Sequence, residues 1–170
     1  MNKKSISLQQ FVEGFQPIVG SSIWRVIHPA DGWLTIDIGQ KYSDTIPSKD
    51  GSDEPYDKGQ YQLHITGDWE VFSGDELVET RKVNGADQKT YFERMDKLAI
   101  NFPLKTIDAV KFKDNKLIIS GDGAQIRVPV NEDGESIGLT VVKLSQSNEP
   151  TSYTHYRYED ELRSLAIVES

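Results

Sequence analysis

The residues best suited to recognise a ligand or a partner lie in SIWRVIHPADGWLTIDIG, residues 22–39. Alternating apolar residues on either side of Pro-Ala-Asp-Gly predict a β-hairpin that turns at residues 29–32. We expect His28 to lie opposite Trp33, with Ile27 and the other isoleucines on the core face. The opposite face then carries Trp24, Val26, His28, Trp33, Thr35 and Asp37. Aromatic side chains beside a histidine and an aspartate can bind a small ligand or anchor a protein partner.

The same face also has a purely structural interpretation, in which the N-terminal helix covers it and the tryptophans are buried. Catalysis by a His28–Asp37 dyad is not expected. In the predicted register these two residues are four positions apart along the hairpin, which is about 13 Å at ~3.4 Å per residue. We therefore treat Trp24, His28, Trp33 and Asp37 as a candidate partner or ligand surface.

A second candidate surface is the acidic segment QKYSDTIPSKDGSDEPYDKG, residues 40–59. It lacks apolar periodicity and is rich in Pro, Gly, Ser and Asp, which predicts a long exposed loop. Its acidic residues Asp50, Asp53, Glu54 and Asp57 do not have the alternate spacing, central glycine and distant glutamate of a calcium-binding EF-hand loop. We expect a solvated acidic surface that holds no metal.

Motifs that carry known catalytic chemistry are missing from the sequence. It contains no cysteine, and its three histidines, His28, His64 and His155, have no second histidine at the spacing of a zinc site. No nucleophile elbow, zinc-binding helix or dinucleotide fingerprint is present. We identify no catalytic, metal-binding or cofactor-binding residue. Acidic residues that converge in space would still allow a hydrolase, as an alternative.

Net charge and hydropathy narrow the class of partner. The chain has 27 acidic and 19 basic residues, a formal net charge of −8. This charge argues against duplex nucleic acid, which proteins hold through Lys and Arg, and it is compatible with a basic protein partner. The N-terminus lacks the apolar stretch of a signal peptide, and no window approaches the ~20 apolar residues of a membrane span. We expect a soluble cytoplasmic protein; the sequence does not indicate its oligomeric state.

Two helices and a set of strands must position these residues. Apolar residues recur at helical spacing from Leu8 to Phe15, and Ser7 and Gln10 have the spacing of a capping box. Pro17 predicts that this helix ends near residue 15. A second helix is predicted over residues 88–98 by an N-terminal aspartate and apolar residues at helical spacing.

A Leu-x-Ile-x-Gly-Asp string occurs twice, as LHITGD at residues 63–68 and as LIISGD at residues 117–122. In the first copy the apolar alternation continues through the Gly-Asp pair, so we expect this pair inside a bent or bulged strand, with the hairpin turn at Gly74-Asp75. In the second copy the phase changes after Gly-Asp, which predicts a hairpin turn there. Another tight turn is predicted at Asp114-Asn115.

Together these patterns predict an α+β fold with one domain over residues 1–148. Its predominantly antiparallel, meander-like sheet has about six to eight strands, with an N-terminal helix and one mid-chain helix. We expect SIGLTVVKL, residues 136–144, to be the last strand of the sheet. Residues 149–170 form a C-terminal extension whose placement the sequence leaves open. The repeated string also leaves open a partial internal duplication of a β-hairpin unit.

The order WLTIDIG, a loop, YQLHITGDWEVF, a turn, and DAVKFKDNKLIISGDGAQIRV resembles that of small uncharacterised bacterial α+β proteins. In those proteins, strand pairs with a Leu-x-Ile-x-x-x-Trp core are joined by variable loops, and several groups are similar to immunity proteins of polymorphic or contact-dependent toxin systems. The resemblance covers residues 20–145. It implies a protein without catalytic activity that binds another protein, and the acidity agrees with a basic, nuclease-type toxin as the partner.

We therefore expect an immunity-like protein-binding module that needs no cofactor. The first alternative is a β-rich module that binds a small ligand in a concavity lined by Trp24, Trp33 and Trp69. The second alternative is an undetected hydrolase, which three or more polar side chains converging beside a pocket would favour.

Overall fold

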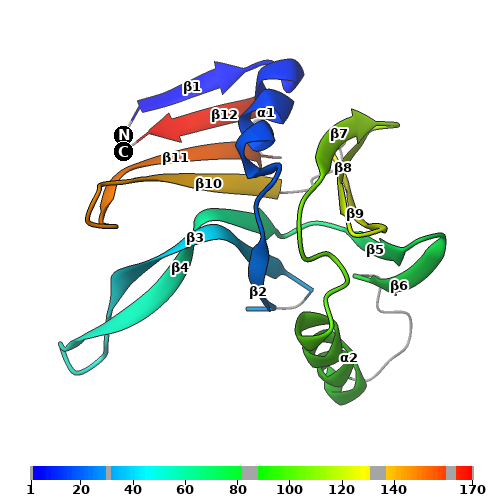
Figure 1. Ribbon diagram of the computed structural model, residues 1–170, viewed down its shortest axis with the longest axis horizontal. Coiled ribbons are helices and arrows are strands. Elements are labelled where there is room, and N and C mark those ends of the chain that lie inside the picture. Colours follow the sequence, from blue (N-terminus) through cyan, green and yellow to red (C-terminus); the bar gives the residue numbers. More distant parts are fainter. Residues whose placement is uncertain (1, 30–31, 82–87, 131–136, 160–163, 170) are drawn as a thin grey trace.

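The computed structural model describes residues 2–29, 32–81, 88–130, 137–159 and 164–169. Over these residues the chain forms twelve strands and two α-helices (Figure 1). The α+β class with two helices and antiparallel pairing is confirmed. The strands make two sheets, however, and not the single sheet of six to eight strands that we expected.

The larger sheet has seven strands in the order β1 (Asn2–Ile6), β12 (Ser164–Glu169), β11 (Pro150–Glu159), β10 (Ile137–Leu144), β4 (Asp53–Ile65), β3 (Leu34–Pro47) and β2 (Ile23–Ile27). The smaller sheet has five strands in the order β6 (Glu76–Thr80), β5 (Glu70–Ser73), β9 (Ala124–Pro129), β8 (Lys116–Gly121) and β7 (Ala109–Lys113). The larger sheet contains two long-range pairs, β4 with β10 and β1 with β12, and the smaller sheet joins its hairpins through one, β5 with β9. The meander prediction therefore holds only locally.

The acidic segment of residues 40–59 is not a loop, which corrects the sequence-based expectation. It forms the distal halves of β3 and β4, which pair from Lys41–Gly59 out to Pro47–Asp53 and extend beyond the other strands (Figure 1). Main-chain hydrogen bonds hold this hairpin, and they do not require an apolar face. The segment therefore lacks the alternation by which a strand is recognised.

The first Gly-Asp pair lies in the segment that connects the two sheets. β4 ends at Ile65 and β5 begins at Glu70, so Gly67 and Asp68 are in a connection and not inside a strand, contrary to our expectation. Burial nevertheless alternates without a break through this connection. Trp69 is fully buried, and its indole N–H donates to the carbonyl of Gly32 over 2.6 Å. The apolar alternation in the sequence therefore predicts correctly which side chains are buried, but the expectation of one continuous strand was wrong.

The three predicted hairpin turns are confirmed at residues 74–75, 114–115 and 122–123. Asp114 and Asn115 have φ of 52° and 58°, and Asp122 and Gly123 have φ of 54° and 73°, which suits the right-handed twist of the flanking strands. The Asp122 carboxylate also accepts the main-chain N–H groups of residues 105 and 106 over 2.8 and 2.7 Å. The second Gly-Asp pair therefore ends a strand and anchors a neighbouring segment.

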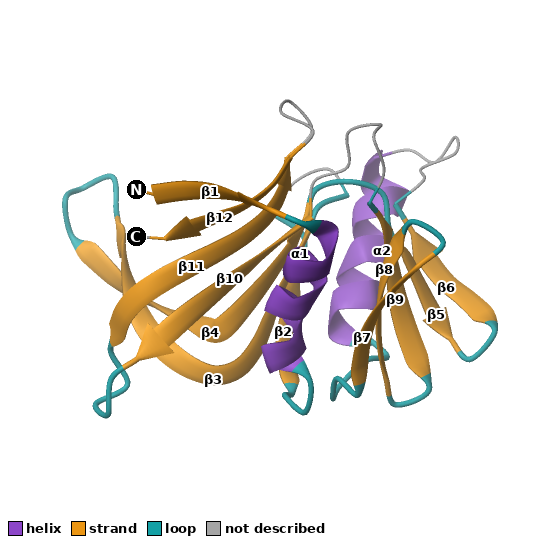
Figure 2. Cartoon of the chain, turned by 90° about the horizontal axis from the view of Figure 1, so that it is seen from above, coloured by secondary structure: helices purple, strands orange, loops and turns teal. Residues whose placement is uncertain are grey.

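Both predicted helices are present. Helix α1 (Leu8–Phe15) begins with the expected capping box between Ser7 and Gln10 and continues into a short 3-10 turn (Gln16–Ile18) that contains Pro17. It lies between the two sheets and contacts β7, β11 and β12 (Figure 2). Helix α2 (Gln88–Ile100) extends slightly beyond the predicted end and packs against β2.

The register between β2 and β3 differs by one residue from the prediction. Ile27 pairs with Thr35 and Arg25 with Asp37, and the ladder shifts beside Trp24. A shift of one residue exchanges the two faces of a strand. Val26, expected on the open face, is therefore buried in the core, whereas Ile27, expected in the core, is only half-buried. Part of the turn that sets this register, residues 30–31, lies outside the described residues.

The expected strand at residues 136–144 appears as β10, but it is not the last strand of the sheet. The chain after residue 148 adds β11 and β12, and β12 pairs with β1 so that Asn2 lies opposite Glu169. One hydrophobic cluster joins both sheets and both helices, and its largest buried side chains include Phe11, Phe15, Ile36, Leu63, Trp69, Met95 and Phe102. The face of β4, β10 and β11 that points away from this cluster carries polar side chains.

Candidate functional site

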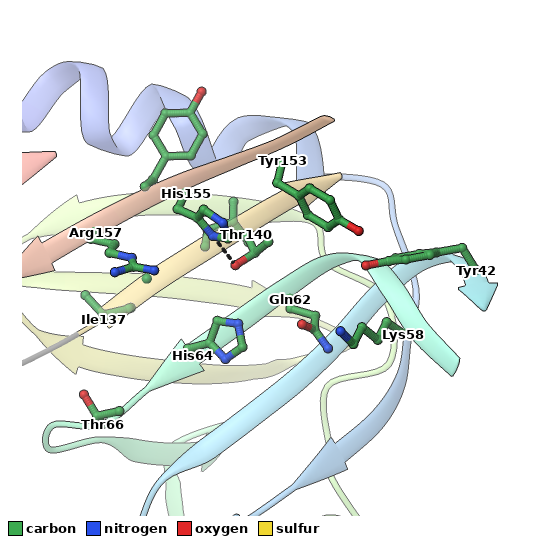
Figure 3. Close-up of a pocket in the computed structure, with 13 residues that line it drawn as sticks. Tyr42, Lys58, Gln62, His64, Thr66, Ile137, Thr140, Tyr153, His155 and Arg157 are labelled. Atoms are coloured by element: carbon green, nitrogen blue, oxygen red, sulfur yellow. Dashed lines mark hydrogen bonds between the residues drawn. The ribbon is translucent and has the colours of Figure 1, made fainter. Parts of the chain in front are cut away.

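The polar face of the larger sheet contains a cavity of about 590 Å³. Figure 3 shows two rows of side chains on one side of the sheet: Lys58, Gln62 and His64 along β4, and Tyr153, His155 and Arg157 along β11. Strand β10 lies between these rows, and β3 contributes Tyr42 at one end. The strands position these residues because side chains two positions apart point to the same face.

Strand register brings residues from distant parts of the chain into cross-strand rows. Gly138 on β10 pairs with His64 on β4 and with Arg157 on β11. In the adjacent row, Thr140 pairs with His155. Because Gly138 has no side chain, nothing from β10 fills the sheet surface between His64 and Arg157.

The two histidines are oriented in the same way, each by a threonine directly across the ladder. His155 Nδ1 is 2.8 Å from the hydroxyl of Thr140, and His64 Nδ1 is 3.4 Å from the hydroxyl of Thr35, a longer contact. Figure 3 shows the first of these bonds. Within the described part of the chain, neither Nε2 atom forms a hydrogen bond. Each ring therefore keeps one nitrogen for a ligand.

Burial lowers the pKa of both histidines. For His64, loss of solvation is the main cause; Asp37 opposes it, and His155, Arg157 and Lys58 reinforce it. For His155, loss of solvation is again the main cause, followed by the charge of Arg157. Both imidazoles are therefore neutral at pH 7 and can donate or accept through Nε2. The effects of His155 and Arg157 on His64 agree with the proximity that the strand register gives these three residues.

A buried carboxylate supports the floor of the cavity. Asp37 is 0% exposed and accepts from the Arg25 guanidinium (2.7 Å), the Gly59 main-chain N–H (2.9 Å) and the Gln62 side-chain amide (2.8 Å). Its oxygens are thus bonded to three donors, as a buried charge requires. The bond to Gln62 fixes the orientation of that amide at the cavity wall.

Two tyrosines close the other end of the cavity. Tyr42 is buried, and its hydroxyl lies close to that of Tyr153 (Figure 3). Burial, followed by the proximity of Tyr153 and Asp44, raises the pKa of Tyr42 well above its ordinary value, so this phenol stays protonated. Lys58 Nζ lies 3.0 Å from Asp44 Oδ2 at this end.

The charge of the cavity is opposite to that of the chain. Of the described residues that line it, Lys58 and Arg157 are cations and none is acidic. The chain as a whole carries a formal charge of −8. A cavity without acidic side chains in so acidic a protein favours an anionic ligand.

The four residues of the first predicted surface do not form one exposed patch. Asp37 is fully buried, and His28 Nε2 lies 2.6 Å from Asp96 of α2. The Trp24 ring lies under two cations, with Arg25 Cζ at 4.7 Å and Lys41 Nζ at 4.5 Å from its centroid. Within the described chain, its buried N–H has no hydrogen-bond partner.

The predicted tryptophan concavity is not formed either. Trp33 is 43% exposed, whereas Trp69 belongs to the hydrophobic core and cannot touch a ligand. Trp24, Trp33 and Trp69 are also absent from the described lining of the cavity. A different set of side chains therefore forms the concave site.

The acidic candidates are exposed, as expected, on the distal β3–β4 hairpin. Asp53, Glu54 and Asp57 lie on β4, and Asp50 lies in the turn. The Asp50 carboxylate accepts from the hydroxyl of Ser48 and from the hydroxyl (2.7 Å) and main-chain N–H (3.0 Å) of Ser52, and these bonds lower its pKa. Asp50 thus stabilises the turn. No group of three or more potential metal ligands occurs among the residues described.

Sequence analysis missed the cavity, although part of its signal was present. The polar series Gln62, His64, Thr66 was visible on β4, and the same alternation of Tyr153, His155 and Arg157 occurs in SYTHYRY. That second series fell in the segment whose placement was left open. Only the register of β4, β10 and β11 shows that the two series face one cavity.

None of the helices in the described chain has the length and apolar character that a membrane span requires. Comparison of the chain with protein-family models, with curated proteins and with solved structures finds no significant match.

Proposed function

We propose that the protein binds a small organic anion in the cavity between β4, β10 and β11. The observation that carries this proposal is the charge reversal: two cations and two neutral histidines line the cavity, and no described lining residue is acidic, in a chain of net charge −8. Lys58 and Arg157 attract an anion, and no acidic side chain in the described lining repels it.

The size and lining of the cavity support a small molecule as the ligand. About 590 Å³ lies within the roughly 300 to 1,000 Å³ typical of such sites. Tyr42 and Tyr153 offer apolar ring surface at one end, and the histidine Nε2 atoms and Arg157 offer hydrogen-bond donors at the other. We therefore expect a ligand with a ring or short hydrocarbon part attached to an acidic group.

Titration followed by two-dimensional NMR tests this proposal. The panel pairs each anion with a neutral analogue, for example benzoate with benzamide and phenyl phosphate with phenol. We expect the anions to perturb the resonances of β4, β10 and β11. Lys58→Gln should weaken binding by about tenfold or more, because a charged hydrogen bond contributes roughly 1.5 to 3 kcal/mol.

The control is Lys111→Gln, which removes an equally positive but exposed side chain on β7, outside the cavity. Equal binding of anions and neutral analogues, or shifts confined to other strands, would overturn the proposal. The spectra also report turnover, because a hydrolysed ligand gives new signals. Turnover would support the hydrolase alternative, although the lining has no carboxylate pair for glycosidase-type chemistry.

Binding of a basic protein is the second candidate, and it corresponds to the immunity-like function expected from the sequence. The observation that favours it is the exposure of Asp53, Glu54 and Asp57 on a hairpin that projects from the sheet (Figure 1). Charge complementarity would steer a basic partner to this hairpin.

This second candidate is tested by capturing partners from host lysate and measuring the affinity of any basic protein that is identified. Replacing Asp53, Glu54 and Asp57 by their amides should slow association and reduce its salt dependence. The control replaces two of these three by their amides, Asp53 and Glu54, and compares them with Asp75 and Glu76, which are equally exposed at the β5–β6 turn. An equal decrease of the association rate in both variants would exclude a specific role for the projecting hairpin.

A further inference from the structure

We infer that the acidic group of the ligand is a phosphate and that it sits on Gly138, between His64 and Arg157. This inference rests on the proposed binding of an anion in the cavity. It adds the chemical class of the ligand and the position of its charge.

The first argument is the shape of the floor. His64, Gly138 and Arg157 are directly opposite one another on β4, β10 and β11, so the glycine is flanked by two side chains that can bind an anion. A Cβ atom at Gly138 would lie 3.7 Å from Arg157 Cγ and 3.1 Å from the Tyr156 carbonyl oxygen. A methyl group would therefore occupy the space beside Arg157 and be slightly crowded by the main chain of β11.

The second argument is the set of donors around this floor. Thr35 and Thr140 engage Nδ1 of His64 and His155, which leaves Nε2 as the ligand-binding atom of each ring. When the threonine hydroxyl donates to Nδ1, the neutral imidazole carries its proton on Nε2 and can donate it to an oxyanion. Arg157 adds a planar guanidinium with several N–H groups.

These donors come from different directions, because His64 is on β4 whereas His155 and Arg157 are on β11 in successive rows. A phosphate monoester has three terminal oxygens in a tetrahedral arrangement and can accept from all three side chains. A carboxylate has two oxygens in one plane and suits a single guanidinium. A doubly charged phosphate also favours the protonated form of both histidines.

The experiment measures dissociation constants by calorimetry for phenyl phosphate and for benzoate, with inorganic phosphate as the minimal probe. His64→Asn keeps a polar atom near the Nδ1 position and deletes Nε2, whereas His64→Gln returns a nitrogen near the Nε2 position. Gly138→Ala fills the floor. The control is His28→Asn, because His28 contacts Asp96 outside the cavity.

We expect phenyl phosphate to bind at least tenfold more tightly than benzoate. His64→Asn and Gly138→Ala should each weaken phosphate binding by about tenfold or more. His64→Gln should restore part of the affinity, and His28→Asn should leave it unchanged. Thermal unfolding will check that Gly138→Ala is folded. Arg157→Gln should also weaken phosphate binding, and this test does not depend on the glycine variant.

Two results would overturn the inference while leaving the proposed function intact. One is tighter binding of benzoate than of phenyl phosphate. The other is a phosphate affinity that His64→Asn and Arg157→Gln leave unchanged. If neither anion binds to the cavity, the inference and the proposed function both fail.

Discussion

Replacing Asp37 by alanine should destabilise the protein far more than replacing any exposed acidic residue. Asp37 is completely buried and bonds to the Arg25 side chain, the Gly59 N–H and the Gln62 amide. Removing one partner of a buried ion pair costs about 3 to 5 kcal/mol, because it leaves charge and donors without compensation. Arg25 is partly exposed, and water will solvate it after the substitution. We therefore expect a loss near the lower limit, about 3 kcal/mol.

The assay is urea unfolding followed by tryptophan fluorescence, with stability calculated from the midpoint and the slope. The control is Asp44→Ala, because Asp44 pairs with Lys58 at a site where both side chains are just over a quarter exposed. Such a pair contributes about 0 to 1 kcal/mol. The reasoning is refuted if Asp37→Ala and Asp44→Ala cost the same, or if Asp37→Ala costs less than about 1 kcal/mol.

Two further predictions concern stability. A Cβ at residue 121 would lie 1.7 Å from the Thr106 carbonyl oxygen, so Gly121→Ala should lower the free energy of unfolding in urea by about 3 kcal/mol. The control is Gly74→Ala, whose Cβ meets nothing within 4 Å and which should cost only about 1 kcal/mol for its positive φ. Equal costs for the two variants would contradict the steric argument. Because folding lowers the pKa of His64 and His155, the unfolded chain binds more protons as the pH falls toward and below about 6.5, and the free energy of unfolding must decrease there. His64→Gln and His155→Gln should each flatten this decrease in unfolding curves recorded between pH 5 and 7.5, and an unchanged slope would show that other groups cause it.

Features set by neighbouring residues were predictable from the sequence. The capping box of Ser7 and Gln10 located α1, and the Asp114-Asn115 and Gly-Asp turns located three hairpins. Each of these depends on the conformational preferences of a few adjacent residues. The distal β3–β4 hairpin was missed because both of its faces are mostly polar, so main-chain pairing leaves no trace in the apolar pattern.

The candidate site could not be predicted because it depends on long-range pairing. In the sequence, His64 has no second histidine at the spacing of a metal site, so its near neighbours along the chain do not mark it as part of a site. His155 and Arg157 come almost a hundred residues later, and β10 must pair with both β4 and β11 before they face the same cavity. A one-residue change in either register would turn these side chains to the opposite face. The one-residue error between β2 and β3 shows how easily sequence-based register fails.

Because Asn2 pairs with Glu169, strand β1 can take its place in the sheet only after β12 has been synthesised. Of the strands in this sheet, β1 is synthesised before all others and its partner β12 after them, so the N–H and C=O groups of β1 have no partner in this sheet until β12 has been made. Contacts between residues so far apart slow folding, and an unpaired strand edge invites association with other chains. A circular permutant that joins β12 directly to β1 and opens the chain between β9 and β10, which belong to different sheets, would turn this pair into a local hairpin without cutting another hairpin. We expect it to refold faster and to aggregate less than the natural order of strands.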